Sequence, residues 1–391
     1  MADAPRRRLK SVDAVRGLII ILMALDHTRD FFGDLAADPT NLATTTAPLF
    51  FTRWITHFCA PAFFLLTGTG AFLSLNRMTK AELSRFLLTR GVWLIILELT
   101  VLRFAMQFNF DYQVTIVTVL WALGWAMIVL AGLVWLPLWL IAAIGGAMVA
   151  GHNLLDGISA APFGALAPLW TILHAPGFLI LTERFSLFIS YPLIPWAGGT
   201  ALGFVLGSVF RLDPAHRAQR LLWWGWGAIV AFFLLRFANV YGDPVPWSRQ
   251  SSLLWTAMSF LNVSKYPPSL LFLLVTLGPL LLLLRAFDRH LPALARPALI
   301  IGKVPLFFFL GHFFLLHLLA VAASFVRYGE IGEMFRSSDM VHFPFSAPLG
   351  WDAGLPAIYA IWIGVLLIMF PLCRWYADVK QRNDSWWLSY L

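Results

Sequence analysis

Charged residues are scarce in this sequence, and so are cysteines. Only 12% of the 391 residues are charged, whereas 60% are hydrophobic, including 34 Phe and 18 Trp. A water-soluble protein of this size could not bury so much apolar surface, so the composition indicates a membrane protein. Cys59 and Cys373 are the two cysteines. We place them near opposite faces of the membrane and expect no disulfide between them.

Features of several other protein classes are also missing. No long polar linker divides the chain, so we expect a single domain over residues 1–391. No internal repeat is visible, so the sequence does not support an inverted-repeat transporter. No nucleophile elbow, phosphate-binding loop or dinucleotide fingerprint occurs in a credible context. The net charge of +8 comes from short basic clusters between apolar segments, which argues against a nucleic-acid partner.

Apolar segments account for most of the chain. A membrane span needs about 20 mostly apolar residues, and about ten segments meet this criterion. They cover residues 14–33, 48–75, 86–108, 113–134, 136–152, 188–210, 220–240, 267–286, 298–325 and 354–373. Segment 165–185 is apolar enough for an interfacial or re-entrant helix. The predicted fold is all-α, a polytopic membrane bundle of about ten transmembrane helices in contact with the lipid bilayer.

The distribution of arginine and lysine gives the orientation of these helices. Cytoplasmic loops collect basic residues. With the N-terminus inside, the inner segments hold Arg6, Arg7, Arg8, Lys10, Arg77, Lys80, Arg85, Arg90, Arg211, Arg217, Arg220, Arg285, Arg289, Arg296, Arg374, Lys380 and Arg382. The outer loops hold only Arg184, Arg249, Lys265, Arg327 and Arg336. We therefore place both termini in the cytoplasm, and we interpret the first apolar run as a retained span.

The first span, RGLIIILMALDHTRDFF at residues 16–32, contains ions that are costly in lipid. From the helix rise, His27 lies ~20 Å above the inner edge of a hydrocarbon core ~30 Å thick. The same estimate brings His57 and His312 to nearly that depth. Four more charged residues fall in the outer half of the bundle, namely Glu98, Arg103, Arg53 and Arg236. We therefore predict one polar cavity in the outer half of the bundle.

Arg16 and His27 are eleven residues apart, about three helical turns, so they share one helix face. This face connects the cytoplasmic mouth with the predicted cavity. Arg16 lies where its guanidinium could meet a phosphate-bearing cytoplasmic ligand. It could instead be an interfacial anchor whose charge reaches the headgroups.

The other polar residues also have structural explanations. Asp26, Arg29 and Asp30 could form local ion pairs at the helix end. The buried histidines could each form one interhelical hydrogen bond, and Glu98 could pair with Arg103. A zinc site built from the three histidines is a further alternative. No metal-binding spacing occurs near them, so we expect no metal.

Five segments resemble one known family. They are RLKSVDAVRGLIIILMALDH, RWITHFCAPAFFLLTGTGAFL, SRFLLTRGVWLIILEL, KYPPSLLFLLVTLGP and GKVPLFFFLGHFFLLH. Together they resemble the bacterial relatives of heparan-α-glucosaminide N-acetyltransferase, a branch of the transmembrane acyltransferases. The resemblance runs from about Arg8 to the C-terminal SWWLSYL. The Arg16-to-His27 spacing is also similar to a first-span motif of the acyltransferase-3 proteins, which modify envelope sugars.

The resemblance implies that acetyl-CoA or another acyl-CoA binds from the cytoplasm. Its acyl group would pass to an amino or hydroxyl group of a sugar or glycoconjugate on the other side. In the animal lysosomal enzyme an asparagine matches His27, and the proposed catalytic histidine lies in the first outer loop. Loop 33–50 has no histidine here, so His27 is the expected substitute. Gly311 and His312 match the family, whereas His57 takes the place of a family aspartate.

These expectations assign roles to the polar residues. His27 is the expected general base, because neutral imidazole transfers protons near pH 7. The expected catalytic set is His27, His312, His57 and Asp26. The expected acyl-CoA-binding residues on the basic inner rim are Arg16, Lys10 and Lys303. The expected substrate-binding residues are Asp30, Arg29, Arg53, Glu98, Arg103 and Arg236.

Two other functions compete with an acyltransferase. A transporter or proton-coupled permease would also place a buried His/Asp/Arg cluster at this depth. A non-catalytic membrane scaffold would leave several buried ions without a purpose. The resemblance further implies a multi-pass protein of the bacterial inner membrane, and related proteins suggest a homodimer.

Overall fold

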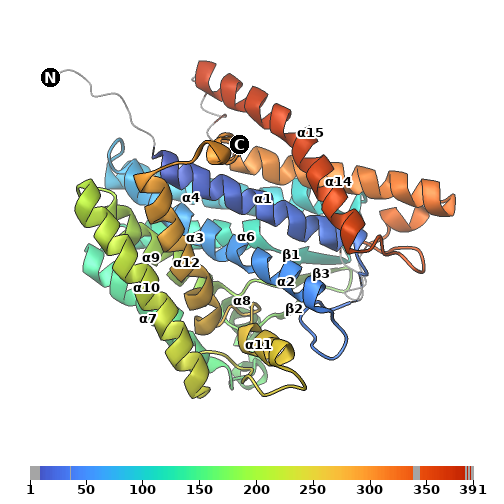
Figure 1. Ribbon diagram of the computed structural model, residues 1–391, viewed down its shortest axis with the longest axis horizontal. Coiled ribbons are helices and arrows are strands. Elements are labelled where there is room, and N and C mark those ends of the chain that lie inside the picture. Colours follow the sequence, from blue (N-terminus) through green and yellow to red (C-terminus); the bar gives the residue numbers. More distant parts are fainter. Residues whose placement is uncertain (1–8, 36, 338–343, 384, 386–387, 389–391) are drawn as a thin grey trace.

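A computed structural model describes residues 9–35, 37–337, 344–383, 385 and 388 of the chain. This part is mostly helical, and Figure 1 shows its long helices packed side by side. The predicted basic cluster Arg6, Arg7 and Arg8 lies outside the described residues, as does most of the C-terminal SWWLSYL segment.

Helices occur at every segment predicted to span the membrane. They are α1 (Lys10–Phe32), α2 (Ala47–Ile55), α3 (Cys59–Ser74), α4 (Lys80–Leu97), α5 (Arg103–Gln107), α6 (Val119–Leu133), α7 (Leu138–Gly151), α8 (Ala167–Leu173), α9 (Leu193–Val209), α10 (Pro214–Ala238), α11 (Leu253–Leu261), α12 (Leu270–Arg289), α13 (Arg296–Ile301), α14 (Pro305–Tyr328) and α15 (Leu355–Arg382). Short helical turns include η1 (Thr56–Phe58), the π-helical η2 (Glu98–Leu102) and η3 (His152–Leu155).

Within the described part of the chain, six helical segments are long and apolar enough to cross a membrane, so the protein is a polytopic membrane protein. They are Ala47–Ser74, Leu138–Leu155, Pro214–Ala238, Leu270–Arg289, Pro305–Tyr328 and Leu355–Arg382. Three shorter apolar helical segments join them, at Val119–Leu133, Ala161–Leu173 and Leu193–Val209. Helix α1 has 23 residues and is therefore roughly 35 Å long. It has the length of a span, but its two ends are charged.

Helix α1 is packed closely among several other helices. In Figure 1, α1, α3, α4, α6 and α14 run beside one another, and α7, α9, α10 and α12 lie against them. Helix α1 contacts α3, α12, α13, α14 and α15. Glycines permit the closest approaches, as small residues commonly do between membrane helices. A Cβ atom at Gly17 of α1 would lie only 1.7 Å from the carbonyl oxygen of Ala298 in α13.

The all-α prediction is wrong in one region, where the structure contains a three-stranded sheet. Strand β1 (Val114–Val117) runs parallel to β3 (Phe185–Ile189), and β2 (Gly177–Thr182) pairs antiparallel with β3. The segment 165–185 therefore forms the short helix α8 and a hairpin strand instead of a longer helix. The strands are rich in β-branched and aromatic residues, which favour extended backbone. Hydrophobicity alone does not separate such short runs from helices.

The prediction that the two cysteines are not paired is confirmed. Cys59 in α3 and Cys373 in α15 are both buried free thiols. The Cys59 thiol lies 3.6 Å from the carbonyl oxygen of Ile19 in α1.

Candidate active site

Two of the three predicted histidines meet at the interface between α1 and α14. The Nδ1 atom of His27 lies 2.7 Å from Nε2 of His312. Their rings are stacked, with centroids 5.0 Å apart and planes 19° apart. His312 is fully buried and His27 is half-buried. The exposed part of the pair therefore belongs to His27.

Hydrogen bonding sets the tautomers of this histidine pair. Nδ1 of His312 lies 3.0 Å from the Phe308 carbonyl oxygen, which can only accept, so Nδ1–H of His312 donates. In the neutral ring Nε2 of His312 is then an acceptor, and Nδ1–H of His27 donates to it. This assignment leaves the lone pair of His27 on Nε2. A neutral imidazole held in this tautomer is suited to remove a proton from a bound group.

A cluster of charges surrounds Asp26, the residue that precedes His27. The Asp26 carboxylate accepts hydrogen bonds from Arg53 at 2.7 and 2.9 Å and from Arg29 at 3.0 Å. Arg29 also donates to Asp30 at 2.6 Å, and the Lys265 ammonium lies 3.9 Å from Asp26. Three cations and two carboxylates thus lie together, and the positive charge exceeds the negative by one. Lys265 was not predicted to belong to this cluster.

A cavity of about 380 Å³ opens among α1, α3, α4, α6, α14 and α15. Four basic side chains line it: Arg16, Arg90, Lys303 and Lys380. The rest of its lining is mostly apolar and includes Phe63, Leu66, Leu87, Leu94, Val119, Leu120, Leu123, Met127, Leu306 and Phe309. Such a combination suits a molecule with an anionic end and a long, weakly polar arm.

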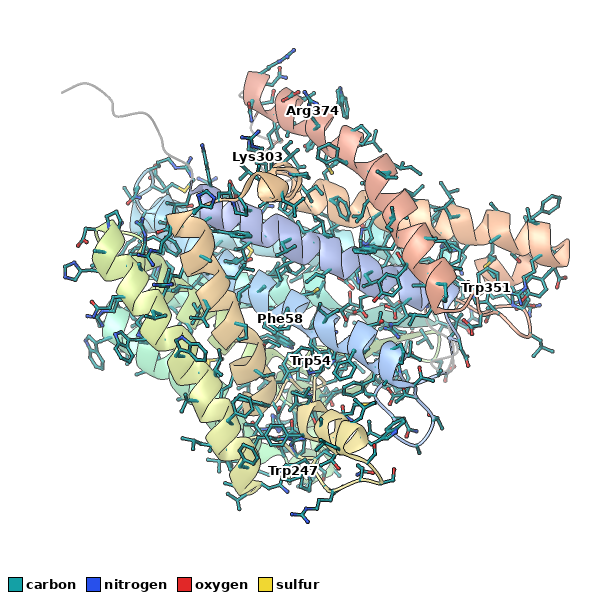
Figure 2. The ribbon with its side chains drawn as sticks, viewed as in Figure 1. Trp54, Phe58, Trp247, Lys303, Trp351 and Arg374 are labelled. Carbon is teal, nitrogen blue, oxygen red and sulfur yellow. The ribbon has the colours of Figure 1, made fainter. Side chains whose placement is uncertain are left out.

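The basic residues of the cavity lie at one end of the long helices. Figure 2 shows Lys303 at the turn before α14, near the part of α15 that carries Arg374. Trp351 lies at the opposite end of α15 (Figure 2). Arg16 donates hydrogen bonds to Asp13 at 2.8 Å and to the Gly302 carbonyl at 3.2 Å. The guanidinium therefore links α1 to the α13–α14 turn where it lines the cavity.

Phe309 connects this cavity with the histidine pair. Its ring lines the cavity and lies edge-on to His27, with centroids 6.0 Å apart. The same ring contacts His312, with a centroid distance of 5.7 Å. Neither histidine belongs to the cavity lining, so Phe309 lies between the cavity and the pair.

His57 does not join the other two histidines through any hydrogen bond or ring contact found among the described residues. It is buried in η1, its Nδ1 atom has no hydrogen-bond partner, and its ring contacts Phe272 at 5.3 Å. Similar depth therefore predicted the meeting of His27 with His312 but did not bring His57 to them.

Three predicted substrate-binding residues are instead engaged by the protein backbone. Glu98 in η2 accepts hydrogen bonds from the backbone N–H groups of Thr118, Leu120 and Trp121, at 2.6, 3.1 and 3.3 Å. Its carboxylate thus caps the start of α6, where the partial positive charge of a helix favours an anion. The suggested Glu98–Arg103 pair is wrong, because Glu98 has these partners.

Arg103 and Arg236 also bind carbonyl oxygens. Arg103 donates to the carbonyls of Asn109 and Asp111. Arg236 is 1% exposed and donates to the carbonyls of Phe260, Val245, Ser259 and Asn262 at 2.8 to 3.0 Å. These two arginines were predicted to line the same cavity as His27. Their N–H groups instead donate hydrogen bonds to loop carbonyls, which holds those loops in place.

Among the predicted acyl-CoA-binding residues, Arg16 and Lys303 line the cavity, whereas Lys10 is an exposed residue outside its lining. Arg90 and Lys380 also line the cavity but were not among the predicted residues. The sequence signal was present, because both belong to the inner basic clusters. Charge patterning shows the side of the membrane, but only packing shows which basic residues share a cavity.

A comparison with known families identifies the protein class. Residues 8–237 match the family described as heparan-alpha-glucosaminide N-acetyltransferase, catalytic. The chain belongs to this family. The family consists of membrane N-acetyltransferases that use acetyl-CoA. No curated protein matches the chain. The family match includes His27 and the cavity residues Arg16 and Arg90, whereas His312 and Lys303 lie beyond it.

Proposed function

We propose that this N-acetyltransferase family member transfers an acyl group, acetyl in the first instance, from acyl-CoA to an amino or hydroxyl group of a sugar or glycoconjugate. Acyl-CoA enters from the cytoplasm and the acceptor from the other side. The observation that carries the proposal is the position of Phe309, which lines the basic-rimmed apolar cavity and contacts both rings of the His27–His312 pair. The proposed location is the bacterial inner membrane, with about ten spans and a homodimeric assembly.

The cavity supports this direction of acyl-CoA entry. The phosphates of CoA would bind near Arg16, Arg90, Lys303 and Lys380. Guanidinium and ammonium groups carry positive charge and donate hydrogen bonds to phosphate oxygens. The pantetheine arm would extend along the apolar lining toward Phe309. The thioester would then lie next to His27, which is within ring contact of Phe309.

The chemical step needs one base on the acceptor side. Nε2 of His27 removes the proton from the acceptor nitrogen or oxygen as that atom attacks the thioester carbonyl. The carbon–sulfur bond breaks, and the CoA thiolate leaves and takes a proton from His27. His312 acts as a positioning residue, because its Nε2 accepts the Nδ1–H of His27 and stabilises the transient imidazolium.

The cluster around Asp26 is proposed to bind the acceptor. Asp26 and Asp30 can accept hydrogen bonds from sugar hydroxyls, and Arg29 and Arg53 orient these carboxylates at 2.6 to 3.0 Å. His57 would complete the same region. Since Glu98, Arg103 and Arg236 are held by the backbone, their proposed contribution is to shape the surrounding loops.

The test combines acetyl-CoA binding with acyl transfer in detergent. Calorimetry should show acetyl-CoA binding to the wild type and to His27→Gln with similar affinity. Release of the CoA thiol is then followed with a panel of amino and hydroxyl sugars. We expect kcat to fall roughly 10²- to 10⁴-fold in His27→Gln, because the general base is lost. The exposed His216, changed to Gln, is the matched control.

A second comparison tests the direction of CoA binding. Lys303→Gln should weaken binding of acetyl-CoA but not of acetyl-pantetheine, which lacks the nucleotide phosphates. Equal binding of acetyl-CoA by Lys303→Gln and the wild type would contradict the proposed orientation of acyl-CoA in the cavity. The transporter alternative predicts solute flux in liposomes without CoA and no acetyl-CoA binding, and that result would reject the acyltransferase proposal.

A further inference from the structure

Outside the histidine pair, three side chains of the kinds that bind metal ions lie close together. His152 and Asp156 belong to the turn η3 and the residue after it, at the end of α7, and His174 follows α8 (Figure 1 labels both helices). Each residue offers one ligand atom, and these atoms all lie within 4.8 Å of one another. The proposed acyl transfer uses none of these residues.

The imidazoles of this cluster are buried without adequate hydrogen-bond partners. His152 is 1% exposed and His174 is 2% exposed. Neither ring nitrogen of His152 has a hydrogen-bond partner, and Nδ1 of His174 has none. A backbone group of Pro268 lies near His152 and one of Leu155 lies near His174, but neither gives the unpaired ring nitrogens a hydrogen bond of acceptable geometry. Buried polar atoms are nearly always paired, so these nitrogens point to a ligand.

The carboxylate of the cluster is already oriented. Oδ2 of Asp156 accepts a hydrogen bond from Nδ2 of Asn153 at 2.8 Å, and Oδ1 of Asn153 accepts from the Leu270 backbone at 2.9 Å. The other oxygen of Asp156 lies 3.4 Å from Nε2 of His174. Two ligands of a tetrahedral ion with bonds of about 2.0 Å stand about 3.3 Å apart. Residues that bind metals are commonly oriented by hydrogen bonds of this kind from neighbouring residues.

Aromatic packing also holds the His174 ring in place. The Trp170 ring lies 5.1 Å from the His174 ring and covers it on one side.

We propose that His152, Asp156 and His174 bind a zinc ion. Two imidazoles and one carboxylate suit a borderline divalent ion such as zinc, whereas calcium and magnesium prefer oxygen ligands alone. Water would fill the fourth position. The ion would fasten the end of α7 to the segment after α8, which leads into the β2–β3 hairpin. This site differs from the zinc alternative considered for His27, His57 and His312.

The test measures metal content directly. The protein is purified through a tag without histidines, and bound metals are counted by mass spectrometry after zinc loading and desalting. We expect about one zinc per chain in the wild type and a large loss in Asp156→Asn and His174→Gln. His216→Gln is the matched control, because His216 forms an exposed pair with Asp213 at 2.5 Å. That variant should keep its zinc.

Two measurements keep the proposal falsifiable if a variant folds poorly. Cobalt added to the metal-free wild type should give the visible absorption of a four-coordinate ion. Zinc should raise the melting temperature of the wild type, and a chelator should reverse the rise. Asn153→Ala, which removes the support of Asp156, should weaken zinc binding roughly 10- to 100-fold. Equal metal content in the wild type and His174→Gln, or a wild type without cobalt absorption and zinc stabilisation, would overturn the proposal.

Discussion

Asp26 balances more charge than any other residue described near the histidine pair. Its carboxylate contacts Arg53, Arg29 and Lys265, and it is 8% exposed. Charges taken out of water are tolerated when they are paired and hydrogen-bonded, and removal of one partner leaves the others uncompensated. We therefore expect the stability of this region to depend strongly on the Asp26 carboxylate.

Asp26→Asn should destabilise the protein by about 3–5 kcal/mol, since it leaves buried cations with only Asp30 as a counter-ion. Unfolding in detergent, followed by heat or denaturant, measures the loss. Asp38→Asn is a suitable control, because Asp38 is exposed and its carboxylate contacts only Thr40 among the described hydrogen bonds. That change should stay within about 0.5 kcal/mol. Identical stability of the Asp26 variant and the wild type would show that the charge cluster is not coupled to folding.

The sequence predicted some individual contacts and missed others for a physical reason. Helix rise places residues by depth, which was sufficient for His27 and His312 because they belong to neighbouring helices. Depth does not show which way a side chain faces, and the ring of His57 contacts Phe272 and not the other two histidines. Arg236 and Glu98 bind backbone groups of segments far along the chain, and no local pattern shows which backbone groups will be near.

At the scale of elements, long apolar runs predicted helix positions well. A span of about 20 apolar residues is a strong signal because the backbone must be hydrogen-bonded internally in lipid. The sheet was missed because β1, β2 and β3 have only four to six residues each. Short apolar runs are compatible with both structures, and the pairing of Val114 with Ser186 depends on contacts distant in sequence.

The packing of α1 on α13 is a second feature that the positions of the apolar segments in the sequence could not predict. The backbones meet at Gly17 and Gly302, where a Cβ at Gly302 would lie 1.8 Å from the Asp13 carbonyl oxygen. The carbonyl of Gly302 also accepts the hydrogen bond from Arg16, the residue before Gly17. The helix contact and the basic rim of the cavity are therefore one structural unit.

Gly17→Ala should separate α1 from α13 and displace Arg16 from the cavity rim. Overpacking of this kind costs about 1–3 kcal/mol, so we expect a lower melting temperature and weaker acetyl-CoA binding. Gly227→Ala in α10 is the control, because a Cβ there meets no other atom within 4 Å. If Gly17→Ala bound acetyl-CoA as tightly as the control, the contact would not position the rim.

At the scale of the whole molecule, the composition established a membrane protein, and the family match agrees with the resemblance seen in the sequence. The single domain over residues 1–391 stays a prediction. The matched region ends at residue 237, yet α14 and α15 from the following part contact α1 directly. The proposed site therefore needs both parts of the chain, with His27 from the first and His312 from the second.

The orientation in the membrane is the last prediction, and the direction of acyl transfer depends on it. Basic residues concentrate on one side because cytoplasmic loops retain them. Arg77, between α3 and α4, should be cytoplasmic, and Arg249, before α11, should face outward; both are exposed. Cysteine at each position is tested with a membrane-impermeant maleimide on intact bacterial cells. The native thiols Cys59 and Cys373 are buried, which keeps background labelling low.

We expect Arg249→Cys to react in intact cells and Arg77→Cys to react only after the membrane is permeabilised. The reverse pattern would place the basic cavity rim on the outside, where acyl-CoA is not available. Acyl transfer from a cytoplasmic donor to an outer acceptor would then be impossible in the proposed direction, even if His27 and His312 remained essential for activity. Labelling therefore tests the direction of the reaction independently of its chemistry.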